Sequence, residues 1–204
     1  MTSPSIAGLA ERFERIPKLA LFGAAALVQL ALLAAMVVDR ANILREGTEV
    51  RLNTQPVDPR DFLRGDYVVL GYDISRLPAG QFLYKRDGPR NPTVFVKLAP
   101  GPDGIYNPVS VHAEPVAVSS PEVLIRGRVA YATDCGNTGQ SLCTKLQIRY
   151  NLESYFVPEG EGKKLEDARN QRKLTVVAAV LPSGRAAIKR LLLDGQPVYE
   201  EPWF

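Results

Sequence analysis

The chain has one long apolar stretch near its N-terminus, followed by short stretches in which apolar and polar residues alternate. The apolar stretch, Leu19 to Val38, is twenty residues long and contains a single polar side chain, Gln29. A helix rises about 1.5 Å per residue, so a segment of this length crosses the roughly 30 Å hydrocarbon core of a bilayer. The pattern therefore predicts a single membrane-spanning helix near the N-terminus.

The residues at either end of this stretch set the expected boundaries. Pro17 lies where a missing N–H costs a helix little, and Gly47 is a residue that commonly follows a helix end. We expect a cytoplasmic tail at 1–17, a helix at 18–46 whose last two turns lie outside the lipid, and an extracytoplasmic domain at 47–204. A cleaved signal peptide has a shorter apolar region and a small-residue cleavage site, and a buried soluble helix is rarely apolar on every face. The membrane anchor is therefore favoured over both.

Small residues gather on one side of the expected membrane helix. Ala20, Ala24, Ala31 and Ala35 recur at spacings of four and seven, while Gln29 lies in a different direction around the axis. Small residues allow a second membrane helix to approach closely, and a glutamine can hydrogen-bond across such a contact. The alternative is that alanine is simply common in membrane spans. We favour a specific partner helix and expect an integral membrane protein as a partner, besides the bilayer itself.

Beyond residue 47 the sequence predicts a mainly β domain. Residues 49–53 alternate with period two, and residues 67–74 form an apolar, aromatic and β-branched run. Turn-forming glycine, proline and aspartate separate further candidate strands at 93–98, 109–118, 123–130, 145–151, 174–180, 186–193 and around Val198. Only 162–173 has a helical pattern. Nine or ten short strands indicate a sandwich or small-barrel domain with one short helix, built as one or two subdomains.

Charge adds little to this picture. The formal net charge is +3, and acidic and basic residues are interleaved along the chain. A nucleic-acid surface would need clustered bases with aromatic platforms, so we expect no nucleic-acid partner. Paired carboxylates such as Glu159 with Glu161, or Asp58 with Asp61, are the type of group that general acid–base catalysis uses. Solvated turn charges explain them better, so we expect no enzyme, metal or cofactor.

Two cysteines help to indicate the cellular compartment in which the C-terminal domain lies. Cys135 and Cys143 are the only cysteines and flank a turn-rich loop between two expected strands. Antiparallel pairing would bring them close enough for a disulfide, which would indicate an oxidising compartment. Free thiols are the main alternative, because a metal site needs more ligands and the sole histidine, His112, lies elsewhere in the sequence. Positive charge is equal on both sides of the span, so the cysteines favour a cytoplasmic N-terminus.

One octet, GDYVVLGY from Gly65 to Tyr72, carries a resemblance to a known family. Its residues Gly65, Asp66, Tyr67, Leu70 and Tyr72 fit the signature of the GDYXXLXY family of membrane proteins. Two later stretches, 155–166 and 186–200, look like further blocks of that family. The resemblance implies a membrane-anchored extracytoplasmic protein that accompanies polytopic membrane proteins, and it implies no particular reaction.

The octet has a structural and a functional interpretation. Gly65 permits a positive φ and Asp66 can accept backbone N–H bonds in a turn, after which side chains alternate between the two faces of a strand. One of the two faces of this strand is then expected to pack in the hydrophobic core. On the functional interpretation, Arg60, Arg64, Asp66 and the two tyrosines form a docking surface, because arginine and tyrosine are frequent in binding hot spots.

We therefore expect a non-catalytic accessory or scaffold subunit of a larger assembly in the bacterial inner membrane, with its C-terminal domain in the periplasm. A binding module for an envelope glycan, peptide or lipid headgroup is the second hypothesis. A carboxylate-based envelope enzyme is the third.

Overall fold

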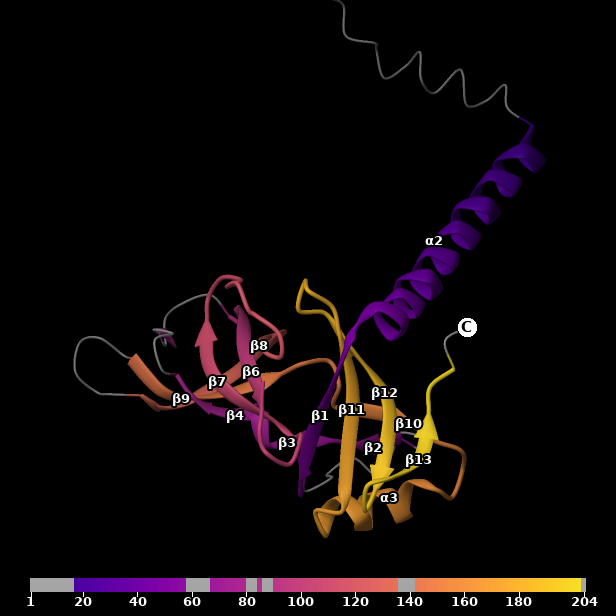
Figure 1. Cartoon of the computed structure of the whole chain (residues 1–204). Helices are drawn as coiled ribbons and strands as arrows, with labels where there is room; N and C mark the ends of the chain where they lie inside the picture. Colours follow the sequence, from indigo (N-terminus) through magenta and orange to yellow (C-terminus); the bar gives the residue numbers. More distant parts are fainter. Residues whose placement is uncertain (1–16, 58–66, 80–83, 86–89, 136–141, 203–204) are drawn as a thin grey trace, which may run out of the picture. The chain divides into compact units, whose positions relative to one another are not determined.

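The computed structural model describes residues 17–57, 67–79, 84–85, 90–135 and 142–202 (Figure 1). It divides into two compact units, an N-terminal one that ends at Ala41 and a β-rich one from Asn42 to Trp203. The second unit is described below as the β-domain.

The apolar segment forms one continuous helix, α2 (Lys18–Glu46), as predicted. It is the one helix among the described residues that is long and apolar enough to cross a membrane. Its side chains up to Ala41 lie outside any protein core, and Ala20, Ala24, Gln29, Ala31 and Ala35 are all exposed on it.

The last turn of α2 belongs to the β-domain. Ile43 and Leu44 are buried against Ala179 and Ala187. Gly47 follows the helix and its N–H donates to the Ile43 carbonyl at 3.0 Å, but it does not have the positive φ of many helix-ending glycines. A Cβ at Gly47 would lie 2.5 Å from the Ile43 oxygen and 2.8 Å from the Val180 nitrogen. Glycine is needed here because two backbone segments approach closely.

Two main antiparallel sheets make up the β-domain. In the first the strands run in the order β13 (Gln196–Glu200), β12 (Ala186–Leu193), β11 (Leu174–Val180), β1 (Thr48–Gln55) and β3 (Gly71–Tyr72). In the second the order is β4 (Arg76–Pro78), β9 (Leu142–Arg149), β8 (Val123–Cys135), β6 (Thr93–Pro100) and β7 (Tyr106–His112), with β5 (Tyr84–Lys85) also paired to β9. A short ladder joins β2 (Tyr67–Val69) to β10 (Ser154–Phe156). The remaining elements are a 3-10 turn, η1 (Asp73–Ser75), and helix α3 (Gly162–Asn170).

The second sheet curls toward a barrel. Its edge strands β4 and β7 line the same cavity of about 390 Å³. The expected fold class, a mainly β domain behind an N-terminal apolar helix, is confirmed.

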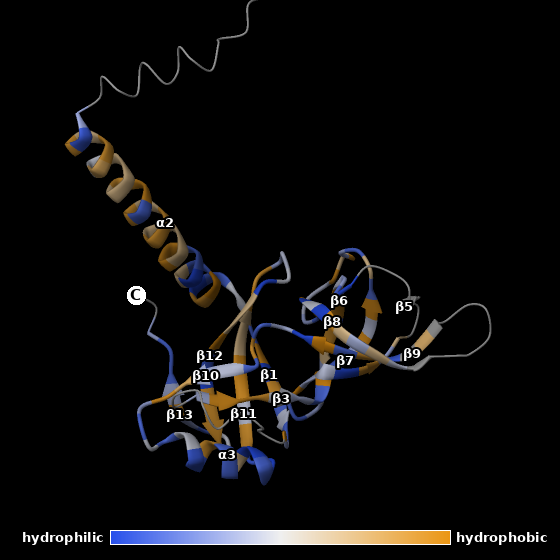
Figure 2. Ribbon diagram, turned by 180° about the vertical axis from the view of Figure 1, so that it is seen from behind, coloured by the Kyte–Doolittle hydropathy of each residue, from blue (hydrophilic) through white to orange (hydrophobic). Residues whose placement is uncertain are grey.

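Both sheets share one hydrophobic core. Alternate residues of β1 and β6 point into it, including Val50, Leu52, Val94 and Val96, which are all fully buried. Figure 2 shows the apolar residues concentrated along the strands of the β-domain. The period-two pattern of the sequence therefore corresponds directly to the inward faces of the strands.

Several strand boundaries differ from the expected ones. The strand expected at 109–118 lies at Tyr106–His112, and the segment after it contains Pro115, which has no N–H for a ladder. Strand β8 continues to Cys135, beyond the expected end at 130. The run expected as one strand at 67–74 breaks at Leu70, which belongs to no strand, although its N–H still donates to the Glu153 carbonyl at 2.8 Å, one step beyond the Val69–Ser154 pair.

Candidate functional site

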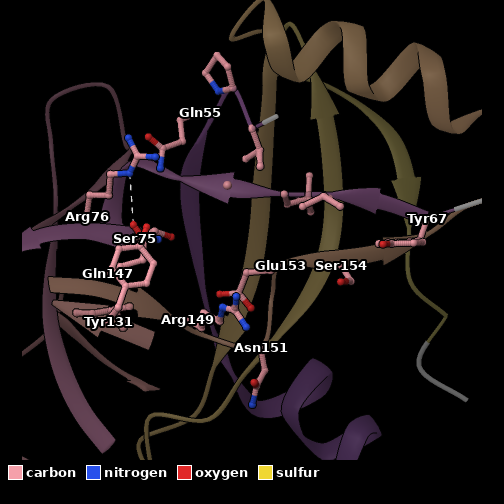
Figure 3. Close-up of a pocket in the computed structure, with 16 residues that line it drawn as sticks. Gln55, Tyr67, Ser75, Arg76, Tyr131, Gln147, Arg149, Asn151, Glu153 and Ser154 are labelled. Carbon is pink, nitrogen blue, oxygen red and sulfur yellow. Dashed lines mark hydrogen bonds between the residues drawn. The ribbon is translucent and has the colours of Figure 1, made fainter. Parts of the chain in front are cut away.

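A cleft of about 910 Å³ lies in the β-domain beside the described residues of the GDYVVLGY octet (Figure 3). Tyr67, Val69, Leu70 and Gly71 of the octet line it. Its other described lining residues come from the end of β1 and the two residues after it, from η1, from the start of β10 and the segment before it, and from β4, β8 and β9 of the second sheet.

The inward-facing side chains of the octet hold this segment against the core. Val68, Leu70 and Tyr72 are buried, at 0%, 1% and 0% exposure, whereas Tyr67 and Val69 are half-buried on the cleft side. The Tyr72 hydroxyl donates to the Leu152 carbonyl at 2.5 Å, and the Tyr150 hydroxyl donates to the Ile74 carbonyl at 2.7 Å. The alternation expected from the sequence is confirmed. One face of this segment packs in the core, and the other lines the cleft.

A buried arginine supports the same strand from α3. Arg169 is fully buried, and its guanidinium donates to the carbonyls of Val69 and Val57, the latter at 3.0 Å. It also donates to the Asn170 side-chain oxygen at 3.0 Å. Burial lowers the pKa of this guanidinium, and the negative charge of Glu166 partly offsets the effect. No pattern in the sequence singles out Arg169, because the charged residues of a short helix usually face solvent.

One wall of the cleft is basic and comes from the second sheet. Arg76 lies opposite Gln147 in the β4–β9 ladder, and its Nε donates to the Gln147 oxygen at 3.3 Å. Arg149 follows two residues after Gln147, on the same side of β9. On β8, Tyr131 lies opposite Gln147 and is 54% exposed. The wall therefore presents cations, a carboxamide and an aromatic ring.

The opposite wall is polar and aromatic. Tyr67 lies opposite Phe156 in the β2–β10 ladder, with ring centroids 6.1 Å apart, and Phe156 is 80% exposed. Ser154 and Glu153 also line this side, and the Glu153 carboxylate accepts the Tyr150 N–H at 2.5 Å. The cleft is thus suited to binding a polar ligand that also has a flat or apolar part.

The expected site residues are only partly placed. Tyr67 lies in the cleft wall and Leu70 and Tyr72 lie in the core, whereas Gly65, Asp66, Arg60 and Arg64 fall outside the described residues. The alanine face and Gln29 belong to the N-terminal unit.

Of the carboxylate pairs considered for catalysis, Glu159 and Glu161 are not among the described residues that line the cleft. Asp58 and Asp61 fall outside the described residues. Glu161 pairs with Lys164 at 3.0 Å on the surface, and this contact lowers the pKa of the carboxyl.

No group of three or more potential metal ligands occurs in the described parts of the chain. His112 shares a hydrogen bond with Ser110 at 2.7 Å.

The two cysteines are in register. Cys135 lies opposite Cys143 in the β8–β9 ladder, the pairing expected from the sequence, and Cys143 is buried. The side chain of Cys135 falls outside those described. The ladder therefore places the two backbones face to face, and the covalent bond is taken up below as a proposal.

A comparison with known protein families gives a match. A family model described as GDYXXLXY protein covers residues 29–191, which include α2 from Gln29 onward and the β-domain as far as Leu191 in β12. No curated protein matches the chain, and no solved structure does.

Proposed function

The chain belongs to the GDYXXLXY family, and from this premise we propose that it is a membrane-anchored, non-catalytic accessory subunit of a larger bacterial inner-membrane assembly. In this proposal α2 holds the protein in the bilayer and packs against a partner's helix. The cleft beside the family octet is the recognition site of the β-domain.

The observation that carries the proposal is the double use of the family octet. Its residues Val68, Leu70 and Tyr72 are buried in the core, while Tyr67, Val69 and Gly71 line the cleft, as Leu70 also does. Hydrogen bonds connect the same segment to its surroundings, since Val69 accepts one from Arg169 of α3 and Tyr72 donates one to Leu152. A wall held in this way is pre-organised, which lowers the entropy lost on binding.

The proposed topology is a cytoplasmic N-terminus and a periplasmic β-domain. It rests on a disulfide between Cys135 and Cys143, which would form in an oxidising compartment. The register of these two residues, which lie opposite each other in the β8–β9 ladder, is the observation that supports the bond.

The test is affinity purification of the full chain from membranes in mild detergent, followed by identification of the bound proteins. Ala24→Leu with Ala31→Leu adds bulk to the alanine face, so the anchor contact should weaken. Ala26→Leu is the matched control, because at 3.6 residues per turn it lies on the other side of the helix. The double variant Tyr131→Ser and Arg149→Gln tests the cleft in the same assay.

The outcomes separate two functions. Loss of a specific co-purifying membrane protein in the alanine variant, but not in the Ala26→Leu control, supports an accessory subunit. If every co-purifying protein survives both the helix and the cleft variants, the accessory proposal fails. The second candidate function, a binding module for an envelope ligand, would then be the better explanation. The cleft lined by Tyr67 and Tyr131 favours this candidate.

A further inference from the structure

Three arginines lie on one outer face of three neighbouring strands beside the cleft. Arg149 on β9 is directly opposite Arg128 on β8. Arg76 on β4 is opposite Gln147, which lies two residues before Arg149 on the same side of β9. All three side chains are exposed, and Arg76 and Arg149 line the cleft.

This cluster of like charge has no acidic partner within the part of the chain that the structure describes. None of the three arginines takes part in an ion pair there, whereas Lys97 and Lys189 are each paired with a glutamate. Like charges directly opposite each other destabilise a sheet. The Arg128–Arg149 pair therefore costs the fold stability, and a bound anion would remove that cost.

Two neighbouring groups shape the cluster. Gln147 accepts a hydrogen bond from Arg76 Nε, and this orients the guanidinium while leaving its terminal nitrogens available (Figure 3). Tyr131, opposite Gln147, presents an exposed ring beside the arginines. Glu153 also lines the cleft, but its carboxylate already accepts the Tyr150 N–H. Among the described residues of the lining, the charged ones are thus two arginines and one glutamate whose carboxylate is already hydrogen-bonded.

The chemistry of the cluster favours a phosphate group. A guanidinium presents a planar fork of donors that matches phosphate or carboxylate oxygens. One carboxylate has two oxygens and one charge and is satisfied by a single fork. A phosphate monoester has three terminal oxygens and a charge near −2 at neutral pH, so it can engage several guanidiniums together.

We propose that this end of the cleft binds a phosphate monoester, with the phosphate held by Arg76, Arg128 and Arg149 and the organic part packed against Tyr131. The inference rests on the proposed use of the cleft as a recognition site and names its ligand class. The phosphate can come from a soluble sugar phosphate or from a phosphorylated lipid headgroup, since both present the same chemistry.

The experiment is isothermal titration of the detergent-solubilised full chain at low ionic strength with four probes. Glucose 6-phosphate represents the soluble source, and short-chain phosphatidic acid, below its micelle-forming concentration, represents the lipid source. Glucose tests the sugar without the phosphate, and citrate tests carboxylates. We expect at least one phosphate probe to bind, glucose not to bind, and citrate to bind more weakly than that phosphate probe.

Variants locate the binding. Arg149→Gln should weaken binding of the phosphate probe by about tenfold or more, because a charge-assisted hydrogen bond is lost. Arg51→Gln is the matched control. It makes the same change on an exposed residue of β1 that does not line the cleft, so affinity should stay unchanged.

Three results would overturn the inference: neither phosphate probe binds, citrate binds as tightly as the phosphates, or Arg149→Gln binds like the unchanged protein. Tight citrate binding would indicate an acidic peptide segment instead. If phosphate binding fails while the cleft double variant still loses its co-purifying partner, the ligand class is wrong and the recognition function stands. If phosphate binds and no variant changes co-purification, the envelope-ligand function replaces the accessory one.

Discussion

Tyr72, the last residue of the family octet, donates its hydroxyl to the carbonyl of Leu152 at 2.5 Å. Tyr150 makes the reverse connection, from its hydroxyl to the Ile74 carbonyl at 2.7 Å. These two bonds cross-link the segment at 72–74 with the segment at 150–152 inside the core. Burial raises the pKa of both tyrosines well above the usual value of about 10, and the negative charge of Glu153 adds to the effect.

The first prediction follows from these raised pKa values. Below about pH 10 both hydroxyls are protonated in the folded and the unfolded chain, and their contribution to stability is complete. Above that pH the unfolded chain releases the protons and the folded chain does not, so the free energy of unfolding should fall by up to about 1.4 kcal/mol per pH unit for each tyrosine. Denaturant unfolding at a series of alkaline pH values measures this slope.

Tyr72→Phe tests the assignment. At neutral pH it should cost about 1–3 kcal/mol, because the Leu152 carbonyl loses its buried donor, and it should make the alkaline slope shallower. Tyr131→Phe is the control, since Tyr131 is exposed and should change neither quantity. An unchanged alkaline slope in Tyr72→Phe would contradict the role given to this hydroxyl.

A second prediction concerns the Arg169 guanidinium. Arg169→Met keeps the length and packing of the side chain but leaves the carbonyls of Val57 and Val69 without their donor, which should cost about 2–4 kcal/mol in denaturant unfolding. Arg169→Lys should not restore the lost stability, because a single ammonium lacks the planar fork of donors that reaches two separate carbonyls. Lys163→Met on the exposed side of the same helix should change stability little. If Arg169→Lys were as stable as the unchanged protein, a positive charge at this position would be enough to hold the two carbonyls, and the fork geometry would not be needed.

A third prediction concerns the joint between α2 and the sheet. Gly47→Ala places a Cβ against the backbone of Ile43 and Val180, which cannot rotate away, and should cost about 1–3 kcal/mol through overpacking. Gly162→Ala is the matched control, because its Cβ would meet only Val157 at 3.8 Å. Thermal unfolding of the two variants in the same detergent compares them. Equal melting temperatures would mean that the joint relaxes without cost.

A fourth prediction concerns the cysteines. Thiol labelling of denatured, unreduced protein should find neither Cys135 nor Cys143 reactive. Replacing both with serine should lower stability by roughly 2–3 kcal/mol, the size expected for closing so short a loop. Labelling of both residues without a reductant would rule out the bond and weaken the case for a periplasmic domain.

A fifth prediction concerns topology. External protease added to spheroplasts should digest the chain beyond about Gly47 and spare the segment before it. A cytoplasmic marker protein must stay intact in the same sample, and a known periplasmic domain must be cut. Protection of the β-domain under those conditions would reverse the orientation.

The sequence was most informative where one face of an element is buried. The alternation of apolar and polar residues in β1 and β6 predicts those strands correctly. Each strand buries one face, with residues such as Leu52 and Val96, and exposes more of the other face to solvent. Tyr67 to Ile74 was harder. Local propensity favours one continuous strand there, but the chain leaves the β10 ladder at Leu70 and joins β1 at Gly71. Only partners more than fifteen residues away decide that break.

The candidate site shows the same limit. The arginines of the basic wall are separated along the sequence by acidic and apolar residues, so a linear scan finds charges of mixed sign. Pairing of β4, β8 and β9 brings Arg76, Arg128 and Arg149 to one face, and no local pattern encodes that register. Tyr67 could be chosen as a site residue because it belongs to a recognisable octet.

The alternation of Val68, Leu70 and Tyr72 has a consequence for how the family signature can vary. Side chains of a strand change face with every residue, so one residue inserted or deleted between Asp66 and Tyr72 would turn the last tyrosine from the core toward the cleft. Its hydroxyl would then no longer reach the Leu152 carbonyl. The octet should therefore tolerate substitution at Val68 and Val69 far better than any change of length, and relatives with an altered count at this point should lack this tyrosine bond.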